Sequence, residues 1–190
     1  MDPLHAPARL VTERLVLRRP ELRDADAIFS RYASDPEVTR YMSFPTHRSV
    51  DDARAFVAFS DAEWERSPAG PFLIERRGDG RLLGGTGLLF ETPQRAVTGY
   101  LLARDAWGRG YATETLAAVV GLAGALGVRR LFAHCHTAHL ASARVLEKCG
   151  FEREGILRAH SEFPNLQPGE PLDVLCYARV LESRRVPPQA

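Results

Sequence analysis

Hydrophobic residues recur along this chain first with the period of strands and then with the period of helices. Apolar and polar residues alternate over Glu13–Arg19, as they do along a strand with one buried face. The segments Phe72–Arg76 and Arg81–Phe90 flank the triplet Gly78–Gly80, which predicts a β-hairpin. The first half of the chain is therefore expected to supply strands to a sheet.

Two helices are predicted among these strands. Asp24 or Asp26 can cap a helix that runs to about Ala33, because a carboxylate accepts hydrogen bonds from the free N–H groups of a helix start. Val50–Arg66 is the second helix, with Ser49 as its candidate cap.

The second half begins with an apolar strand, Val97–Ala103, followed by a long amphipathic helix, Ala112–Leu126. Apolar residues recur on this helix every three or four positions, so one face is expected in the core, and Gly127 is expected to end it. Further strands are predicted at Arg129–His136, Phe151–Leu157 and Leu172–Leu181. This order of elements predicts an α/β sandwich with a mixed sheet.

A glycine-rich turn, Trp107–Glu114 (WGRGYATE), joins that strand to that helix. Gly108 and Gly110 permit a tight turn, and the helix start leaves N–H groups without partners. These N–H groups, the positive end of the helix dipole and Arg109 suit a pyrophosphate. The alternative is a strand-to-helix turn that binds nothing.

The spacing of the glycines argues against two common nucleotide-binding motifs. The chain has no GxxxxGK[ST] run, which disfavours a kinase or ATPase. Thr113 stands in place of the third glycine of the dinucleotide fingerprint GxGxxG, and no βαβ unit precedes it, which disfavours a nicotinamide enzyme.

Three separated motifs, TERLVLR, WGRGYATETL and S-x-x-VLEKCGF, give the chain a resemblance to the Rim-type N-acetyltransferases of the GNAT superfamily, from about Leu10 to Val180. The resemblance implies a mixed, mostly antiparallel sheet flanked by helices, in which a splayed strand pair holds acetyl-CoA. It also implies the phosphate signature Q/R-x-x-G-x-G/A, with Trp107 where the family often has Gln or Arg. The cofactor-binding residues implied are Tyr100, Leu101, Leu102 and Ala103 on the strand, Trp107, Gly108, Arg109, Gly110, Tyr111, Ala112 and Thr113 in the turn, and His139 and Ser142 beyond it.

Ser142 matches the serine that the family places beneath the thioester, where its hydroxyl would hydrogen-bond the CoA sulfur and relay a proton. Many superfamily members use a tyrosine on that helix as the acid, and none occurs between His139 and Gly150. His139 itself stands where the family usually has Asn, a change that puts cofactor affinity in question.

The general base is left open, because Val97 occupies the position that best matches a glutamate common in the family. Glu162 is the first candidate. It lies in HSEFPN, which resembles a family loop that carries a functional glutamate beside an aromatic residue, here Phe163. Histidine titrates near neutral pH and can also serve as a base. The other candidates are His136, His160 and Glu91.

The acceptor implied by the resemblance is a primary amine, and the predicted acceptor wall comprises Tyr41, Met42, Phe44, His47 and Phe163. An α-amino group is already about a tenth to a sixth neutral at pH 7, whereas about 0.04% of a lysine amine is neutral. A protein or peptide N-terminus is therefore favoured over lysine, with attack in a ternary complex. A small-molecule acetyltransferase, for an antibiotic or a polyamine, and a catalytically silent CoA-binding module are the alternatives.

Composition adds limits of its own. The 190 residues carry a net charge of +1, with one lysine, Lys148, and scattered arginines, so no nucleic-acid partner is expected. Residues 1–190 are expected to form one domain with a core at about 10–181, and no apolar run is long enough to span a membrane. Three cysteines without CxxC spacing favour a cytoplasmic location and no metal site. A homodimer is compatible with the sequence.

Overall fold

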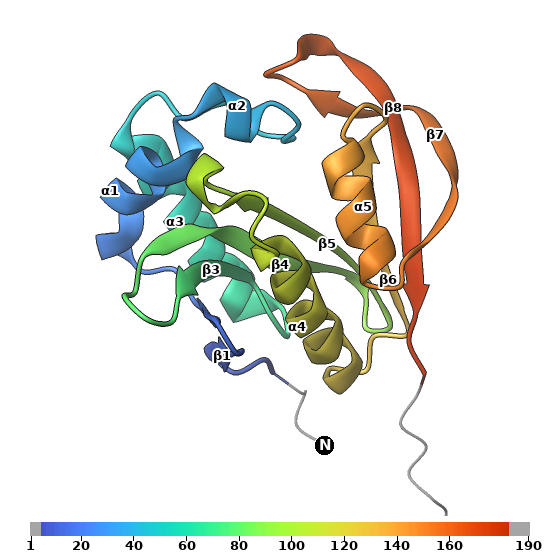
Figure 1. Cartoon of the computed structure of the whole chain (residues 1–190), viewed down its shortest axis with the longest axis horizontal. Helices are drawn as coiled ribbons and strands as arrows, with labels where there is room; N and C mark the ends of the chain where they lie inside the picture. Colours follow the sequence, from blue (N-terminus) through green and yellow to red (C-terminus); the bar gives the residue numbers. More distant parts are fainter. Residues whose placement is uncertain (1–4, 183–190) are drawn as a thin grey trace, which may run out of the picture.

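One sheet of eight strands organises the computed structural model of the chain, which describes residues 5–182 (Figure 1). The strands lie in the order β1-β2-β3-β4-β5-β6-β8-β7, and every neighbouring pair is antiparallel except β5 and β6. The strands are β1 (Arg9–Val11), β2 (Leu15–Arg18), β3 (Pro71–Arg76), β4 (Leu82–Thr92), β5 (Arg95–Leu102), β6 (Arg130–His136), β7 (Glu152–Phe163) and β8 (Gln167–Val180). The predicted mixed, mostly antiparallel sheet is confirmed.

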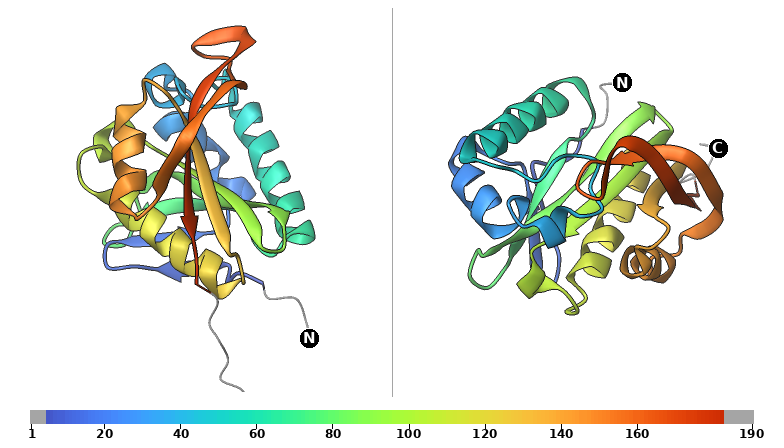
Figure 2. Two further views of the ribbon diagram at one scale, coloured as in Figure 1. Left: turned by 90° about the vertical axis from the view of Figure 1, so that its right-hand side faces the viewer. Right: turned by 90° about the horizontal axis from the view of Figure 1, so that it is seen from above.

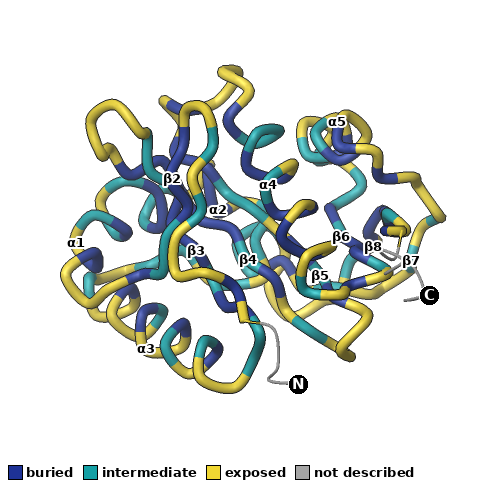
Figure 3. Tube along the Cα trace, turned by 90° about the horizontal axis from the view of Figure 1, so that it is seen from below, coloured by how far each residue is buried: buried dark blue, intermediate teal, exposed yellow. Residues whose placement is uncertain are grey.

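Helices cover both faces of this sheet, as Figures 2 and 3 show. Helices α4 and α5 lie on one face, and α1 and α3 lie on the other. The helices are α1 (Ala25–Ile28), α2 (Pro36–Thr39), α3 (Val50–Arg66), α4 (Tyr111–Ala125) and α5 (Leu140–Lys148). Three single turns complete the set, namely 3₁₀ turns at Leu22–Asp24 and Arg104–Ala106 and a π-helical turn at Phe29–Ala33.

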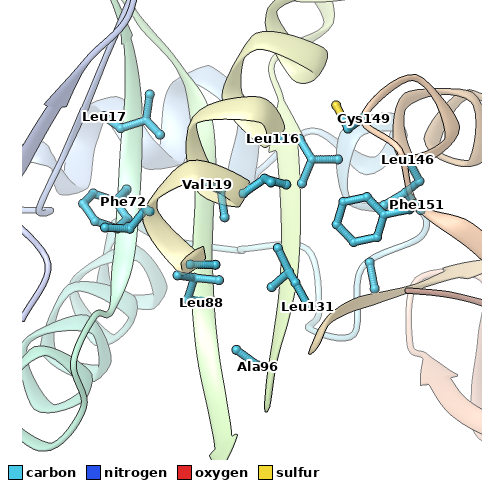
Figure 4. Close-up of a cluster of buried hydrophobic side chains, with 14 of the residues drawn as sticks. Leu17, Phe72, Leu88, Ala96, Leu116, Val119, Leu131, Leu146, Cys149 and Phe151 are labelled. Atoms are coloured by element: carbon cyan, nitrogen blue, oxygen red, sulfur yellow. The ribbon is translucent and has the colours of Figure 1, made fainter. Parts of the chain in front are cut away.

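The main core lies between the sheet and the pair α4 and α5. Leu116 and Val119 of α4 are fully buried, and they lie among Leu88, Leu131 and Phe151 in Figure 4. A second cluster lies on the opposite face, where α1 and α3 pack on the sheet. Its fully buried side chains include Ile28, Val57 and Leu73.

Several local signals are confirmed. The hairpin forms between β3 and β4, with Gly80 at a φ of 68°. Ser49 precedes α3, where the Asp52 carboxylate accepts the Ser49 N–H at 3.1 Å. Gly127 follows α4 with a φ of 85°, a conformation that glycine adopts without strain.

The N-terminal part differs from the expectation in two ways. The strand expected over Glu13–Arg19 is shortened to β2, and β1, which was not expected, precedes it across a turn in which the Thr12 N–H donates to the Leu15 carbonyl at 2.9 Å. Asp24 does not cap α1 with its side chain. Its carboxylate instead binds the Arg18 guanidinium at 2.7 Å, so a salt bridge has taken the place of the predicted cap.

The last two strands are longer than expected. HSEFPN, expected as a loop, continues β7 up to Phe163, and Ser161 and Glu162 pair with Leu172 and Pro171 of β8. Two extra residues bulge between Leu157 and Ser161, because the partner strand advances by only two residues over the same interval.

Strands β5 and β6 separate soon after they meet. Their parallel pairing covers only Arg95, Ala96 and Val97 of β5, although β5 continues to Leu102. Within residues 5–182, the β6-facing edge of β5 beyond Val97 thus has no strand partner. The expected splayed pair is present, and its open edge leaves backbone groups for a ligand.

No helix in the described part of the chain is both long and apolar enough to cross a membrane. Over the same residues, no group of three or more His, Cys, Asp and Glu side chains is arranged to hold a metal ion.

Candidate active site

A cavity of about 490 Å³ opens between the start of α4, helix α5 and the unpaired part of β5. It brings together most of the residues predicted to bind the cofactor. Its lining includes Tyr100, Leu101, Leu102, Trp107, Gly108, Gly110, Tyr111, Ala112, Thr113, His139 and Ser142. Ala103 and Arg109 do not line it.

The glycine turn has the geometry of an anion cradle. Gly108 and Gly110 have φ angles of 71° and 78°, which any residue with a side chain adopts only under strain. The N–H groups of Tyr111, Ala112 and Thr113 have no hydrogen-bond partner among residues 5–182. They therefore remain available to the oxygens of a phosphate, at the positive end of the α4 dipole.

A polar network fixes the turn between β1 and β2 against the first turn of α4. Glu114 accepts the Thr12 hydroxyl at 2.6 Å and the Arg14 side-chain Nε at 2.6 Å. Arg14 also donates to the Arg109 carbonyl at 3.0 Å, and its guanidinium lies 4.8 Å from the centre of the Tyr111 ring. Arg14 thus neutralises Glu114 and places a second cation near the cradle, a role that sequence inspection missed because the partners are about 100 residues apart.

Trp107 stands where the family pattern often has Gln or Arg, and its side chain binds the backbone beside the turn. Its indole Nε1 donates to the Leu102 carbonyl at 2.7 Å, which satisfies a backbone group at the open end of β5. The ring remains about half exposed beside the cofactor cavity. The departure from the family pattern therefore has a structural function.

The tyrosine that the sequence did not supply on α5 comes from β5. The Tyr100 hydroxyl lies 3.1 Å from the Ser142 hydroxyl at the start of α5. Burial raises the pKa of Tyr100, so its hydroxyl keeps its proton at neutral pH. Burial likewise raises the pKa of Cys135, which neighbours Ser142, to about 11. Tyr100 and Ser142 thus place protonated hydroxyl groups at the cavity.

A second cavity, of about 670 Å³, lies on the opposite side of β5, between the sheet and helices α1 and α3. Met42, Phe44 and His47 of the predicted acceptor wall line it, and so does Val97. Burial lowers the pKa of His47, which favours its neutral form at pH 7. Met42, Tyr100 and Leu101 line both cavities, so the two cavities are adjacent at the unpaired part of β5.

Tyr41 borders the cofactor cavity and is held by two histidines. Its ring stacks on His139 with centroids 4.6 Å apart and on His136 with centroids 5.1 Å apart. Burial lowers the pKa of both imidazoles. The departure of His139 from the family's Asn is thus accompanied by a packing role against the loop after α2.

Asn165, in the turn between β7 and β8, binds the same loop through its side chain. Its side-chain oxygen accepts the Thr46 N–H at 2.7 Å and the Thr46 hydroxyl at 3.0 Å. Its amide nitrogen donates to the Thr39 and Phe44 carbonyls, both at 2.8 Å. One side chain thus ties the hairpin to both ends of the segment that carries Tyr41, Met42 and Phe44.

Several predicted site residues lie outside both cavities. Glu162 is exposed on β7, and His160 contacts His134 with ring centroids 4.6 Å apart. Phe163 is buried, and its ring meets that of His136 edge-on at 5.1 Å. Neither cavity is lined by any of the four predicted residues, Glu162, His160, Phe163 and His136, so their roles stay predictions.

A sequence model described as the acetyltransferase (GNAT) domain matches residues 14–152 of the chain. The chain belongs to this family. An uncharacterized N-acetyltransferase of Bacillus subtilis, YoaA, is 35% identical over 90% of this chain and 96% of its own length. The uncharacterized N-acetyltransferase p20 of Bacillus licheniformis is 32% identical over 80% of this chain and 87% of its own. This GNAT protein is thus an N-acetyltransferase.

Solved structures agree with this fold. The RimL ribosomal L7/L12 alpha-N-protein acetyltransferase in complex with coenzyme A superposes with a TM-score of 0.79 and 22% identity, covering 90% of this chain and 97% of that one. The microcin C7 self-immunity acetyltransferase MccE, in complex with acetyl-CoA and AMP, gives a TM-score of 0.81 at 19% identity, covering 95% of this chain and all of that one.

Replacing Gly110 by Val is expected to weaken acetyl-CoA binding at least about tenfold, or 1.4 kcal/mol. The positive φ disfavours a β-branched residue, and its Cβ would lie 3.4 Å from the Arg14 guanidinium, so the cradle must shift. Calorimetric titration measures the dissociation constant. Gly124→Val, at an open and exposed position late in α4, is the matched control. An unchanged constant in folded Gly110→Val would contradict the cofactor assignment.

Removing the Asn165 side chain is expected to lower the free energy of unfolding by about 1–3 kcal/mol, because Asn165→Ala leaves the backbone groups of Thr39, Phe44 and Thr46 without their partner. Denaturant titration measures this loss, and hydrogen exchange should show faster exchange at the Thr46 amide. Gln167→Ala, which removes a 2.7 Å hydrogen bond to Glu170 on the same hairpin, is the control. Equal effects of the two substitutions would show that Asn165 has no special role.

Proposed function

We propose that this N-acetyltransferase transfers the acetyl group of acetyl-CoA to the α-amine of a peptide or protein N-terminus, by direct attack in a ternary complex. One observation carries the proposal: two cavities on opposite sides of β5 share Met42, Tyr100 and Leu101 as lining residues. A donor in one cavity and an amine in the other would bring their reacting groups together there, which is the chief requirement of a direct transfer.

The residues of the first cavity fit acetyl-CoA. The free N–H groups of Tyr111, Ala112 and Thr113 suit its pyrophosphate, and the open edge of β5 suits the amides of its pantetheine arm. Arg144 and Lys148 lie one helical turn apart on α5 and also line this cavity, where they add positive charge. When bound, acetyl-CoA supplies an activated acetyl thioester.

The protein must also provide a proton for the departing thiolate. Tyr100 is the proposed donor, because burial keeps its hydroxyl protonated and the residue lines both cavities. Ser142 is the proposed relay, since its hydroxyl lies 3.1 Å from that of Tyr100. The proton transfer predicted for Ser142 alone is thus proposed for Ser142 and Tyr100 together.

The acceptor side of the site explains the preference for an α-amine. Val97 contributes an apolar side chain where the family commonly has a glutamate, and Asp52 is the only carboxylate among the described residues that line the acceptor cavity. Asp52 is exposed and already accepts the N–H groups of Arg48 and Ser49, at 2.7 and 3.1 Å. A weak base suffices for an amine that is partly neutral at pH 7, but not for a lysine. RimL, among the structural neighbours, is a ribosomal L7/L12 alpha-N-protein acetyltransferase, which supports the same acceptor.

A peptide with a free N-terminus should be a better substrate than its Nα-blocked, lysine-containing counterpart. The kcat/KM of the free peptide should rise about tenfold between pH 6.5 and 8, following its neutral amine. Steady-state rates on both peptides test this. A better rate on the blocked peptide would overturn the preference, and acetylation of small amines alone would favour the small-molecule alternative.

The predicted bases are tested in the same assay with Glu162→Gln, His136→Gln and His160→Gln. Replacing the true base should lower kcat/KM more at pH 6.5 than at pH 8, because the neutral amine is scarce at pH 6.5. Binding of acetyl-CoA without turnover of any amine would favour the CoA-binding module.

Tyr100→Phe and Ser142→Ala should each lower kcat by about one to two orders of magnitude, with acetyl-CoA affinity near that of the wild type. The double variant should lose little more than either single variant, because the two hydroxyls act as one unit. Losses that multiply in the double variant would argue for independent roles. A change confined to KM for acetyl-CoA would make the pair positioning residues.

A further inference from the structure

The floor of the acceptor cavity is a stretch of sheet without side chains. Gly87 of β4 lies directly opposite Gly99 of β5, and both line the cavity. The cross-strand pairs on either side of them on this face are Gly85 with Leu101 and Leu89 with Val97. Glycine inside a strand weakens the sheet, and such positions often mark a close approach by a ligand.

The space above this floor is open. A Cβ built on Gly99 meets no atom within 4 Å, and its φ lies outside the left-handed region, so the backbone does not require glycine there. A Cβ on Gly87 would lie 3.2 Å from the Pro71 Cα, which is a tight contact, so the free volume lies over Gly99. The absence of a side chain at Gly99 therefore leaves volume for an occupant.

Most side chains around this volume are apolar, although His47 and Asp52 also line the cavity. Helix α3 contributes Phe56 and Phe59, the loop after α2 contributes Met42 and Phe44, and helix α1 contributes Ile28. The threonines of the floor turn their hydroxyls to the sheet: Thr86 donates to the Gly99 carbonyl and Thr98 to the Gly87 carbonyl, both at 2.8 Å.

We infer that the acceptor of this enzyme carries a bulky apolar group next to its amine, and that this group occupies the slot over Gly87 and Gly99. This inference rests on the proposed function. The amine then lies toward Met42, Tyr100 and Leu101, where the two cavities meet. N-terminal leucine or phenylalanine has the chemistry that the slot recognises, and an acidic or hydroxylated first residue does not.

Solvation gives the reason for this selectivity. A polar or charged substituent that enters the slot loses its water among mostly apolar side chains, which is costly. An apolar substituent gains from the same transfer. The exposed Asp52 carboxylate at the start of α3 adds repulsion against an acidic substituent.

The test uses one peptide sequence with Gly, Ser, Asp, Leu or Phe as its free N-terminal residue. The kcat/KM for Leu and Phe should exceed that for Ser and Asp by about tenfold or more, as expected for burying a few methylene groups. Rates for Ser or Asp that equal or exceed those for Leu and Phe would overturn the inference and leave the proposed function intact.

Gly99→Leu places a side chain in the slot. This substitution should lower the ratio of kcat/KM for the Phe peptide to that for the Gly peptide about tenfold, with the dissociation constant of acetyl-CoA unchanged. Gly121→Leu, at an exposed position of α4 with open space around it, should leave the ratio as in the wild type. An unchanged ratio in Gly99→Leu would overturn the inference.

Binding provides a readout that does not depend on turnover. Leucinamide should shift the amide resonances of Gly87 and Gly99 at lower concentration than serinamide does, and Gly99→Leu should abolish this difference. Preferential binding of leucinamide without acetylation of any peptide would support the slot and contradict the proposed function. Equal binding of the two amides would contradict the slot.

Discussion

The separation of β5 from β6 after three residue pairs is the constraint on which the rest of the site depends. A strand in the middle of a sheet normally has both edges paired, and here one edge beyond Val97 is open within the described chain. The opening exposes the backbone to a ligand and lets cavities on the two faces of β5 meet. Tyr100 borders both cavities because it lies on this part of the strand.

The two cavities differ in the chemistry of their walls. The proposed cofactor side offers free N–H groups at the start of α4 and the cations Arg144 and Lys148, which suit a polyanion. The acceptor side offers glycine backbone and apolar side chains, which suit an uncharged group. This division follows from the layers of the fold, since a helix start points into one cavity and the sides of α1 and α3 wall the other.

Contacts between distant segments give both cavities their fixed walls. Glu114 ties the β1–β2 turn to α4 beside the cradle, and Asn165 ties the β7–β8 hairpin to the loop after α2. Each anchor satisfies several polar groups at once, and the Tyr41 ring stacks on His136 and His139. Because these walls are already held in place, less conformational entropy is lost when a ligand binds.

The sequence by itself determined the elements whose signals are local. The β3–β4 hairpin, helix α4 with its final glycine and the glycine turn before it all follow from neighbouring residues, because backbone conformation and helix ends depend on the nearest few positions. The family motifs added the sheet type and the cofactor side of the site.

Only the tertiary structure brought Tyr100 to Ser142, 42 residues away, and Asn165 to Thr39, 126 residues away. It also made a strand of the first four residues of HSEFPN, since pairing with β8 outweighed the local turn signals. These outcomes depend on strand register, on the bulge in β7 and on the splay of β5 from β6, which are set by contacts across the whole sheet and not by any stretch of neighbouring residues.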